Sequence, residues 1–209
     1  MPSAEGLSIP GYDSKGEQSC LLKVGKCRLR EKKTGLFGLV SVKMADLSNV
    51  EVEMRNPQDR STSDGDFGEG DLPEMVGLFK EIPRFLRWNN VEYFEVQGIT
   101  ITFHDPAGST STIRAGKMSP LPRGQLFLEG GVVLTDEGSG RQLTTGQVVW
   151  WPNLGVYAVS GTYSLRRPGR IQRARHTLFD AKLEPITNEK EITRYEQRAS
   201  AASFPGNTE

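Results

Sequence analysis

The sequence has little of what marks several large classes of protein. Its 209 residues include only two cysteines and two histidines, and 26 Lys and Arg residues balance 26 Asp and Glu residues. This balance argues against a nucleic-acid-binding protein, which needs a clustered basic face to displace counterions from phosphates. The cysteines and histidines lack the spacing of a zinc site. Because no nucleophile–base pair or glycine-rich phosphate loop is present, the sequence predicts a non-enzymatic protein without metal or cofactor.

Long apolar segments are also absent. No stretch approaches the roughly 20 consecutive apolar residues that a membrane-spanning helix requires. The first residues, MPSAEGLSIPG, do not resemble a signal peptide. Two explanations stay open: the protein is cytosolic, or the printed sequence starts after an anchor or signal that has been removed.

The two cysteines are Cys20 and Cys27, seven residues apart. On one regular strand they would point to opposite faces, so a disulfide would need a turn or bulge between them, which Gly25 could provide. We favour two small buried side chains without a bond between them, because free cysteine is commonly buried.

Glycine and proline are frequent, with 23 and 12 residues, which is typical of many short strands separated by turns. We expect a flexible start over residues 1–8, a single all-β domain over residues 9–186 and a polar tail over residues 187–209. VEVEM (50–54) illustrates the alternation of apolar and polar residues in a half-buried strand.

An insertion is expected at residues 55–90. Its first part, 55–71, is acidic, rich in glycine and nearly free of apolar residues, which is typical of a solvated or disordered loop. The second part, 71–88, has apolar residues at helical spacing and predicts one short amphipathic helix. These residues are Met75, Phe79, Ile82 and Leu86. We favour a helix that covers the open end or edge of a sheet over one that lies on a membrane.

A glycine recurs in the middle of the strand pattern in the second half of the chain. FEVQGITITF, LFLEGGVVLT and YAVSGTYSL carry it at Gly98, at Gly130 and Gly131, and at Gly161, an interval of about 30 residues. Apolar residues stand at even positions before Gly98 and at odd positions after it. A bulge or corner at glycine would turn both sets toward one interior. Repeated corners would fold the chain into stacked V-shaped antiparallel layers, a half-open β-jellyroll.

The stretch LFLEGGVVLTDEGSGRQLTTGQVVWWPNLGVYAVSGTYSL (126–165) resembles the OstA-like repeat of the lipopolysaccharide-transport proteins. That repeat alternates glycine-centred apolar strands with polar turns, a threonine-containing strand and an aromatic strand. The opening IPGYDSKGEQSCLLKVGKCRLR (9–30) resembles the start of LptC-like domains. The resemblance covers most of residues 9–54 and 91–184. The insertion at 55–90 departs from the family pattern, and the anchor helix expected of LptC-like proteins is not in the sequence.

The resemblance implies a periplasmic protein of Gram-negative bacteria, with an OstA-like β-jellyroll whose concave interior shields the acyl chains of lipid A. Such proteins, LptA among them, pass lipopolysaccharide toward the outer membrane along an export bridge. They dock with other transport proteins through exposed edge strands, which also permits head-to-tail self-association. The resemblance is compatible with an inner-membrane anchor outside the printed sequence. Whether this chain is the anchored subunit or the soluble bridge stays open.

Strand parity predicts which side chains line the interior groove. The predicted stripes are Ile99, Ile101 and Phe103; Leu126, Leu128, Val132 and Leu134; Val149 and Trp151, or alternatively Val148 and Trp150; and Tyr157, Val159, Tyr163 and Leu165. Because an apolar stripe on a strand is usually core, we expect only some of these residues to touch lipid.

Five arginines between the last two strands are candidates for contacts with lipid A phosphates at the mouth of the groove. They are Arg166, Arg167, Arg170, Arg173 and Arg175. A solvated turn with snorkelling arginines is an equally good explanation.

Two other functions stay open. A structural or assembly module would pair edge to edge with partner proteins without binding lipid, and its interior would be fully packed. A carbohydrate-active β-protein would need paired carboxylates on a concave face. Asp136 and Glu137 lie in a turn and Glu129 is isolated among apolar neighbours, so the enzyme is the weakest of the three hypotheses.

Overall fold

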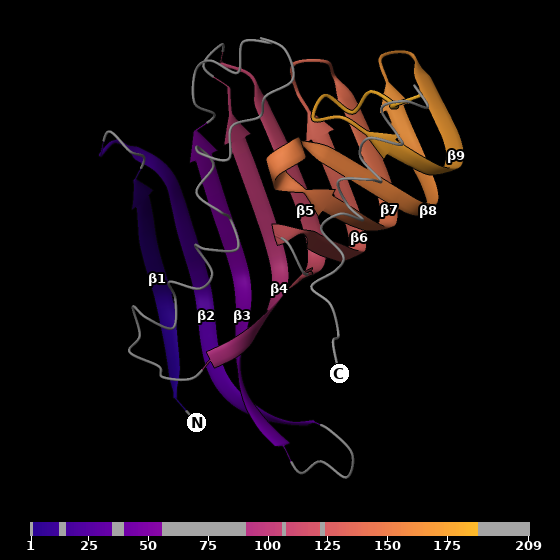
Figure 1. The fold of residues 1–209 in the computed structure, drawn as a ribbon. Coiled ribbons are helices and arrows are strands. Elements are labelled where there is room, and N and C mark those ends of the chain that lie inside the picture. The colour runs from indigo at the N-terminus through magenta and orange to yellow at the C-terminus, as the bar shows by residue number, and fades with distance from the viewer. Residues whose placement is uncertain are drawn as a thin grey trace, which may run out of the picture.

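The computed structural model describes residues 2–12, 16–34, 40–55, 91–105, 108–121 and 124–187. In this part of the chain nine strands form one open sheet, in which each strand lies beside its neighbours in sequence (Figure 1). The strands are β1 (Ser3–Tyr12), β2 (Gln18–Thr34), β3 (Val40–Arg55), β4 (Val91–His104), β5 (Thr110–Pro120), β6 (Leu126–Asp136), β7 (Arg141–Trp151), β8 (Val156–Arg167) and β9 (Arg170–Phe179). The predicted all-β class is confirmed.

All neighbouring strands pair antiparallel except β3 and β4, which are parallel. A parallel pair needs a crossover connection rather than a tight turn, and residues 56–90 separate these two strands in the chain. The predicted acidic loop and amphipathic helix fall almost wholly on those residues, outside the described part of the chain, as does the tail from residue 188. β1 begins at Ser3, inside the stretch for which the sequence predicted flexibility.

Each of the nine strands changes direction near its middle, and the residues at which the strands bend lie opposite one another across the sheet. The paired residues on either side of each bend show this alignment. In β1 and β2, for example, Glu5 pairs with Lys26 and Leu7 pairs with Val24, and Gly6 and Gly25 lie between these pairs. We call this line of residues the crease. It consists of Gly6, Gly25, Asn49, Gly98, Gly116, Gly130 with Gly131, Gly146, Gly161 and His176. The glycine corners that the sequence indicated at three places are therefore part of one feature that crosses all nine strands.

Glycine is required at the crease for two different reasons. Gly98 has a φ of 69°, a left-handed conformation that side chains other than asparagine seldom adopt. At Gly116 the constraint is space, because an added Cβ would lie 2.7 Å from the carbonyl oxygen of Gly130. Asn49 and His176 cross the crease without being glycine, with φ values of 54° and 49°.

The crease divides the sheet into two arms. The first arm contains residues 7–12, 18–24, 50–55, 99–104, 110–115, 132–136, 141–145, 162–167 and 170–175; the second contains residues 3–5, 26–34, 40–48, 91–97, 117–120, 126–129, 148–151, 156–159 and 177–179. Both arms contribute buried apolar side chains to one hydrophobic cluster. In β4, Val96 before the crease and Ile99 and Ile101 after it are all buried, as the change of parity at Gly98 predicted. The core therefore lies between the arms of a bent sheet.

Candidate functional site

The interior between the arms contains most of the side chains that strand parity selected. Ten of the predicted groove residues are buried: Ile99, Ile101, Leu126, Leu128, Val132, Leu134, Tyr157, Val159, Tyr163 and Leu165. Phe103 is half-buried and packs against the same cluster. Their placement in the interior follows from the structure, while contact with lipid stays a prediction.

In β7 the interior pair is Val148 and Trp150, and the preferred assignment of Val149 and Trp151 to the interior was wrong. Val148 and Trp150 are 1% and 3% exposed, whereas Val149 and Trp151 are only half-buried. Trp150 pairs with Leu126, an interior residue of β6, and directly opposed residues share a face of the sheet. The two tryptophans face opposite ways, as adjacent residues on a strand must.

Aromatic rings from opposite arms meet inside the core. Phe103 of the first arm packs edge to face on Trp150 of the second arm, with ring centroids 5.8 Å apart. Tyr163 and Phe179 form a second edge-to-face pair across the arms at 5.0 Å. Thr177 also donates a hydrogen bond of 3.1 Å to the Tyr163 hydroxyl. In this part of the molecule the arms are in direct contact.

The Trp150 indole nitrogen and the Tyr157 hydroxyl are polar groups within this apolar region. The Trp150 indole nitrogen is buried and has no hydrogen-bond partner among the described residues. Tyr157 stacks on Trp150 with ring centroids 6.0 Å apart. Burial raises the pKa of the Tyr157 hydroxyl, and the carboxylates of Asp180 and Asp136 raise it further, so the phenol stays protonated at physiological pH.

The N-terminal strands supply interior residues that were not included among the groove candidates. Buried apolar residues of β2 and β3 belong to the same cluster: Cys20, Leu22, Val24, Cys27, Ala45, Leu47, Val50, Val52 and Met54. The alternation in VEVEM predicted this face for β3. In β2 the phase changes at Gly25, and only the crease explains why residues on both sides of it face inward.

Both cysteines are free and buried, as the favoured interpretation held. They lie on opposite sides of the crease, and the change of direction at Gly25 turns both toward the core. Burial raises the pKa of Cys20, and burial together with the Asp46 carboxylate raises the pKa of Cys27 to about 12. A thiol that stays protonated is a poor nucleophile.

A hollow of about 280 Å³ lies beside Cys20, and Glu53, Arg55 and His104 line it together with Gln18, Ser19 and Leu21. Lys23 donates a 2.7 Å hydrogen bond to Glu53 and lowers the pKa of that carboxyl group. The hollow therefore combines a protonated thiol with a carboxylate that is already ion-paired, which is not the arrangement of a nucleophile and its base.

The carboxylates considered for an enzyme lie on different faces. Asp136 is buried at the end of the first arm, on the interior side with Leu134. It accepts hydrogen bonds from the Ser111 hydroxyl at 3.0 Å and from the backbone and hydroxyl of Ser139. Glu129 is half-buried in the second arm, where it forms an ion pair with Lys117. Glycosidic-bond hydrolysis needs two carboxyl groups that flank one bond, and these two do not provide them.

The five arginines are divided between the two faces of the sheet. Arg167 and Arg170 pair with each other and stand in phase with the interior residues Leu165 and Ala174. Arg167 is half-buried, and its Nε is buried without a hydrogen-bond partner in the part of the chain that the structure describes. Arg166, Arg173 and Arg175 stand on the outer face and are exposed. Because neighbouring positions on a strand point to opposite faces, Arg167 and Arg170 are the two of the five arginines that lie at the rim of the interior.

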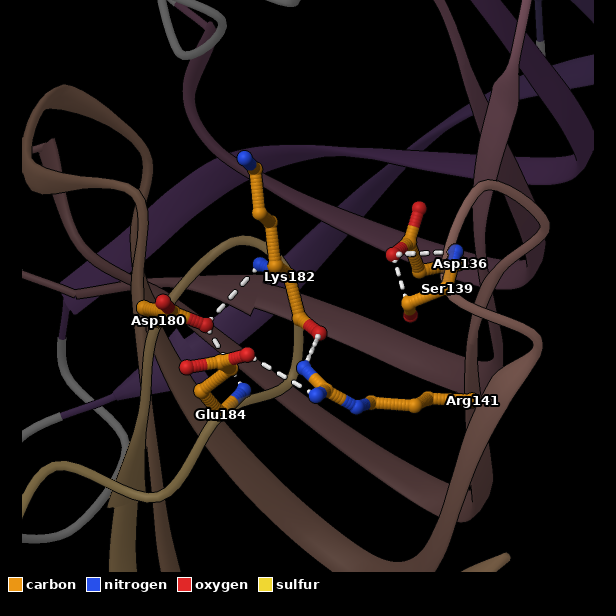
Figure 2. A network of polar contacts seen from close by, with 6 residues as sticks. All are labelled: Asp136, Ser139, Arg141, Asp180, Lys182 and Glu184. Atoms are coloured by element: carbon orange, nitrogen blue, oxygen red, sulfur yellow. Dashed lines mark hydrogen bonds and ion pairs between the residues drawn. The ribbon is translucent and has the colours of Figure 1, made fainter. Parts of the chain in front are cut away.

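Residues 180–186, which we call the clasp, tie the two arms together at the C-terminal end of the sheet. The clasp follows the second-arm end of β9, and Arg141 at the first-arm end of β7 holds it (Figure 2). The Arg141 guanidinium donates a 3.0 Å hydrogen bond to the Lys182 carbonyl and forms a 2.8 Å ion pair with Glu184. Leu183 of the clasp is 2% exposed and belongs to the core.

Hydrogen bonds within the clasp fix its shape. The Asp180 carboxylate accepts from the backbone amides of Lys182 and Glu184 at 2.9 and 2.7 Å, as Figure 2 shows. The Ile186 amide donates to the Leu178 carbonyl at 2.9 Å, so the clasp pairs with the second-arm end of β9. No feature of the sequence indicated this contact, because Arg141 and Glu184 belong to no common motif.

Among the residues that the structure describes, no group of three or more His, Cys, Asp or Glu side chains could hold a metal ion. In the same residues no helix combines the length and apolar character needed to cross a membrane.

No protein-family model and no curated protein matches this chain. The resemblance to the lipopolysaccharide-transport proteins is therefore carried by the residues of the repeat alone and stays a prediction.

Proposed function

We propose that this protein is a periplasmic component of lipopolysaccharide export, and that the bent sheet is a half-open OstA-like β-jellyroll. Lipid A acyl chains would lie between the arms. One observation carries the proposal: along the sheet, both arms turn apolar side chains toward one continuous interior. Each methylene group that enters such an interior contributes ~0.8 kcal/mol, so several chains bind tightly without specific polar contacts.

Binding on this proposal requires the arms to separate. Phe103 and Trp150 close the interior across the crease, so an acyl chain would have to displace this contact. The unpartnered indole N–H of Trp150 would then donate to an ester or amide carbonyl of lipid A. Arg167 and Arg170 at the rim would meet its phosphates, while Arg166, Arg173 and Arg175 stand on the outer face and would not take part.

The ends of the sheet fit the bridge part of the proposal. Within the described residues β1 and β9 are its two edge strands. Among the described residues the clasp pairs with β9 near Leu178, and no described strand pairs with residues 170–176 on their outer side. A free edge accepts a strand from another protein by backbone hydrogen bonding, which is how transport partners would dock.

The test is photo-crosslinking to purified lipopolysaccharide from matched neighbouring positions. A benzophenone amino acid at Leu134 or Ile101 faces the interior, whereas one at Val133 or Thr102 faces outward on the same strands. We expect labelling from the interior positions only, with circular dichroism confirming that each variant folds. Equal labelling from both faces, or labelling from the outer positions alone, would contradict the proposal.

A structural module that pairs edge to edge without lipid is the second candidate. The observation that favours it is the direct contact of aromatic rings from opposite arms, which leaves that part of the interior filled. It predicts head-to-tail oligomers that a proline in β9 disrupts. Proline should be placed at Ile171 and, separately, at Gln172, because backbone amides of neighbouring strand residues point to opposite sides. Loss of oligomers in one variant, with no crosslinking to lipopolysaccharide, would favour this module.

A further inference from the structure

A hollow of about 470 Å³ opens on the outer face of β7, β8 and β9, close to the crease. The outward-facing residues of its lining form two rows across the three strands. The first row consists of Thr144, Ser164 and Arg173, which occupy directly paired positions. The second row lies two residues away from the first on each strand and consists of Gly146, Thr162 and Arg175.

The shape of the hollow follows from Gly146 and from the buried row beneath it. No atom lies within 4 Å of the position that a Cβ of Gly146 would occupy, so this corner of the hollow is open. Between the two rows, Thr145 and Tyr163 point inward and are buried. Thr145 donates a 2.9 Å hydrogen bond to the Thr162 carbonyl and holds the backbone beneath the hollow. The surface is therefore built on a fixed part of the core.

The chemistry of the lining is that of hydrogen-bond donors. Arg173 and Arg175 stand two residues apart on the same face, a spacing of roughly 7 Å that lets both guanidinium groups reach one small anion. Thr144, Thr162 and Ser164 add three hydroxyl groups. In the described part of the chain neither arginine has an ion pair, and no carboxylate lines the hollow.

Two other hollows near the crease contain both signs of charge. One of about 440 Å³ has Glu51 opposite Arg114 in its lining. One of about 410 Å³ has Lys117 with Glu95 and Glu129, and Lys117 forms ion pairs with both carboxylates. The hollow on β7–β9 differs from these two because its positive charge is not balanced by its own lining.

We propose that the hollow on β7–β9 binds a phosphate group. Arg173 and Arg175 contact its oxygens with their guanidinium groups, and the hydroxyls of Thr162 and Ser164 donate to the same group. Guanidinium groups match phosphate through paired N–H donors, and hydroxyls serve the remaining oxygens. The phosphate belongs either to a soluble phosphorylated molecule or to a lipid headgroup. The site lies on the face opposite the apolar interior, so it does not depend on the proposed lipid-carrying function.

Edge protection is the competing explanation for these arginines, because charged side chains on an edge strand discourage aggregation. That role depends on charge alone, so it does not distinguish Arg173 and Arg175 from other exposed arginines such as Arg28 and Arg166. A phosphate site depends on position and on the planar guanidinium. These differences give the experiment its controls.

Binding should be measured on the whole chain at low ionic strength, with inorganic phosphate by calorimetry and with vesicles of phosphatidylcholine containing phosphatidic acid by co-sedimentation. The site variant carries Arg173→Gln and Arg175→Gln, and the control carries Arg28→Gln and Arg166→Gln, which removes the same charge from exposed positions outside both proposed binding regions. We expect the site variant to weaken binding by roughly tenfold or more and the control to change it by less than about threefold, since charge-assisted hydrogen bonds are stronger than diffuse attraction.

A third variant, with Arg173→Lys and Arg175→Lys, keeps the charge and should still lose most of the affinity. Preference for the vesicles over free phosphate would identify a headgroup, and the reverse would identify a soluble ligand. The proposal is overturned if neither probe binds, if both glutamine variants lose affinity equally, or if the lysine variant binds as well as the native chain. Crosslinking to the interior is unaffected by any of these outcomes.

Discussion

Phe103 and Trp150 pack edge to face with ring centroids 5.8 Å apart, although β5 and β6 lie between their strands. In a flat sheet three strand spacings would separate β4 and β7 by roughly 14 Å. The contact forms because the two residues lie on opposite sides of the crease, which brings the arms together. This pair is therefore a direct measure of whether the sheet is bent.

The two neighbouring tryptophans of β7 should differ strongly in their effect on stability. Trp150→Ala removes a buried ring that contacts Phe103 and Tyr157, and we expect the free energy of unfolding to fall by about 3–5 kcal/mol. Trp151→Ala removes a half-buried ring on the outer face and should cost clearly less. Urea denaturation of both variants checks this. Equal losses would contradict the assignment of Trp150 to the interior.

Two glycines of the crease should respond differently to the same substitution. Gly116→Ala places a Cβ 2.7 Å from the Gly130 carbonyl oxygen, so the backbone must shift, and we expect a loss of about 1–3 kcal/mol. Gly146→Ala meets no atom within 4 Å and has no positive φ, so its effect should stay within about 0.5 kcal/mol. Thermal unfolding of the two variants is the measurement, and a loss for Gly116→Ala no larger than that for Gly146→Ala would contradict the close approach of Gly116 to Gly130.

The clasp should loosen when Arg141 is replaced. Arg141→Gln removes the ion pair with Glu184 and the hydrogen bond to the Lys182 carbonyl. Because Glu184 is largely exposed, we expect a loss of only about 1 kcal/mol in global stability. Local opening is the sharper readout: the Ile186 amide, which donates to the Leu178 carbonyl, should exchange with solvent faster.

Arg166→Gln is the matched control for the clasp, since this exposed side chain lies on the outer face of the same end of the sheet. It should leave exchange at Ile186 unchanged. Unaltered exchange in Arg141→Gln as well would mean that Leu183 alone holds the clasp in place.

The stability of the protein should fall at alkaline pH because of Cys27. Its pKa is raised from 9.0 to about 12 in the folded state, so between these values the unfolded chain loses a proton that the folded chain keeps. The free energy of unfolding therefore decreases as pH rises through this window, by up to ~1.4 kcal/mol per pH unit. Below pH 9 this contribution is constant.

Cys27→Ala provides the comparison. The variant loses some packing at every pH, but its stability should depend less steeply on pH between 9 and 11 than that of the native chain. Guanidinium denaturation over this range measures both slopes. Parallel curves for the two proteins would show that the thiol does not carry the effect.

Local patterns in the sequence predicted much of the interior. In β4 the alternation of apolar residues has a clear phase on each side of Gly98, and both sets belong to or pack against the core. In β7 the run VVWW has no phase, so periodicity could not choose between Val148 with Trp150 and Val149 with Trp151. The choice is made by pairing with Leu126 of β6, a contact between strands that a single-strand pattern does not contain.

The crease, too, could be predicted only in part from patterns within single strands. Gly98, Gly130, Gly131 and Gly161 indicated corners, and Asn49 also crosses the crease with a left-handed φ. Asparagine tolerates this conformation but adopts it only in a minority of cases, so its presence did not mark the corner. Alignment of the corners depends on the register of each strand against the next. Register is set by the whole sheet, because a slip of one residue would turn every apolar side chain to the wrong face.

By itself, the sequence determined the all-β class, the apolar face of most strands and the positions of several corners, because these depend on alternation and on glycine's freedom of backbone conformation. Only the tertiary structure decided that β3 and β4 are parallel, that the corners form one crease and that Arg141 holds the clasp. These features join residues that are distant in the chain, and no local pattern encodes which distant strand or charge a residue will meet. The surfaces proposed for function depend on such contacts, so they form only when the two arms are assembled.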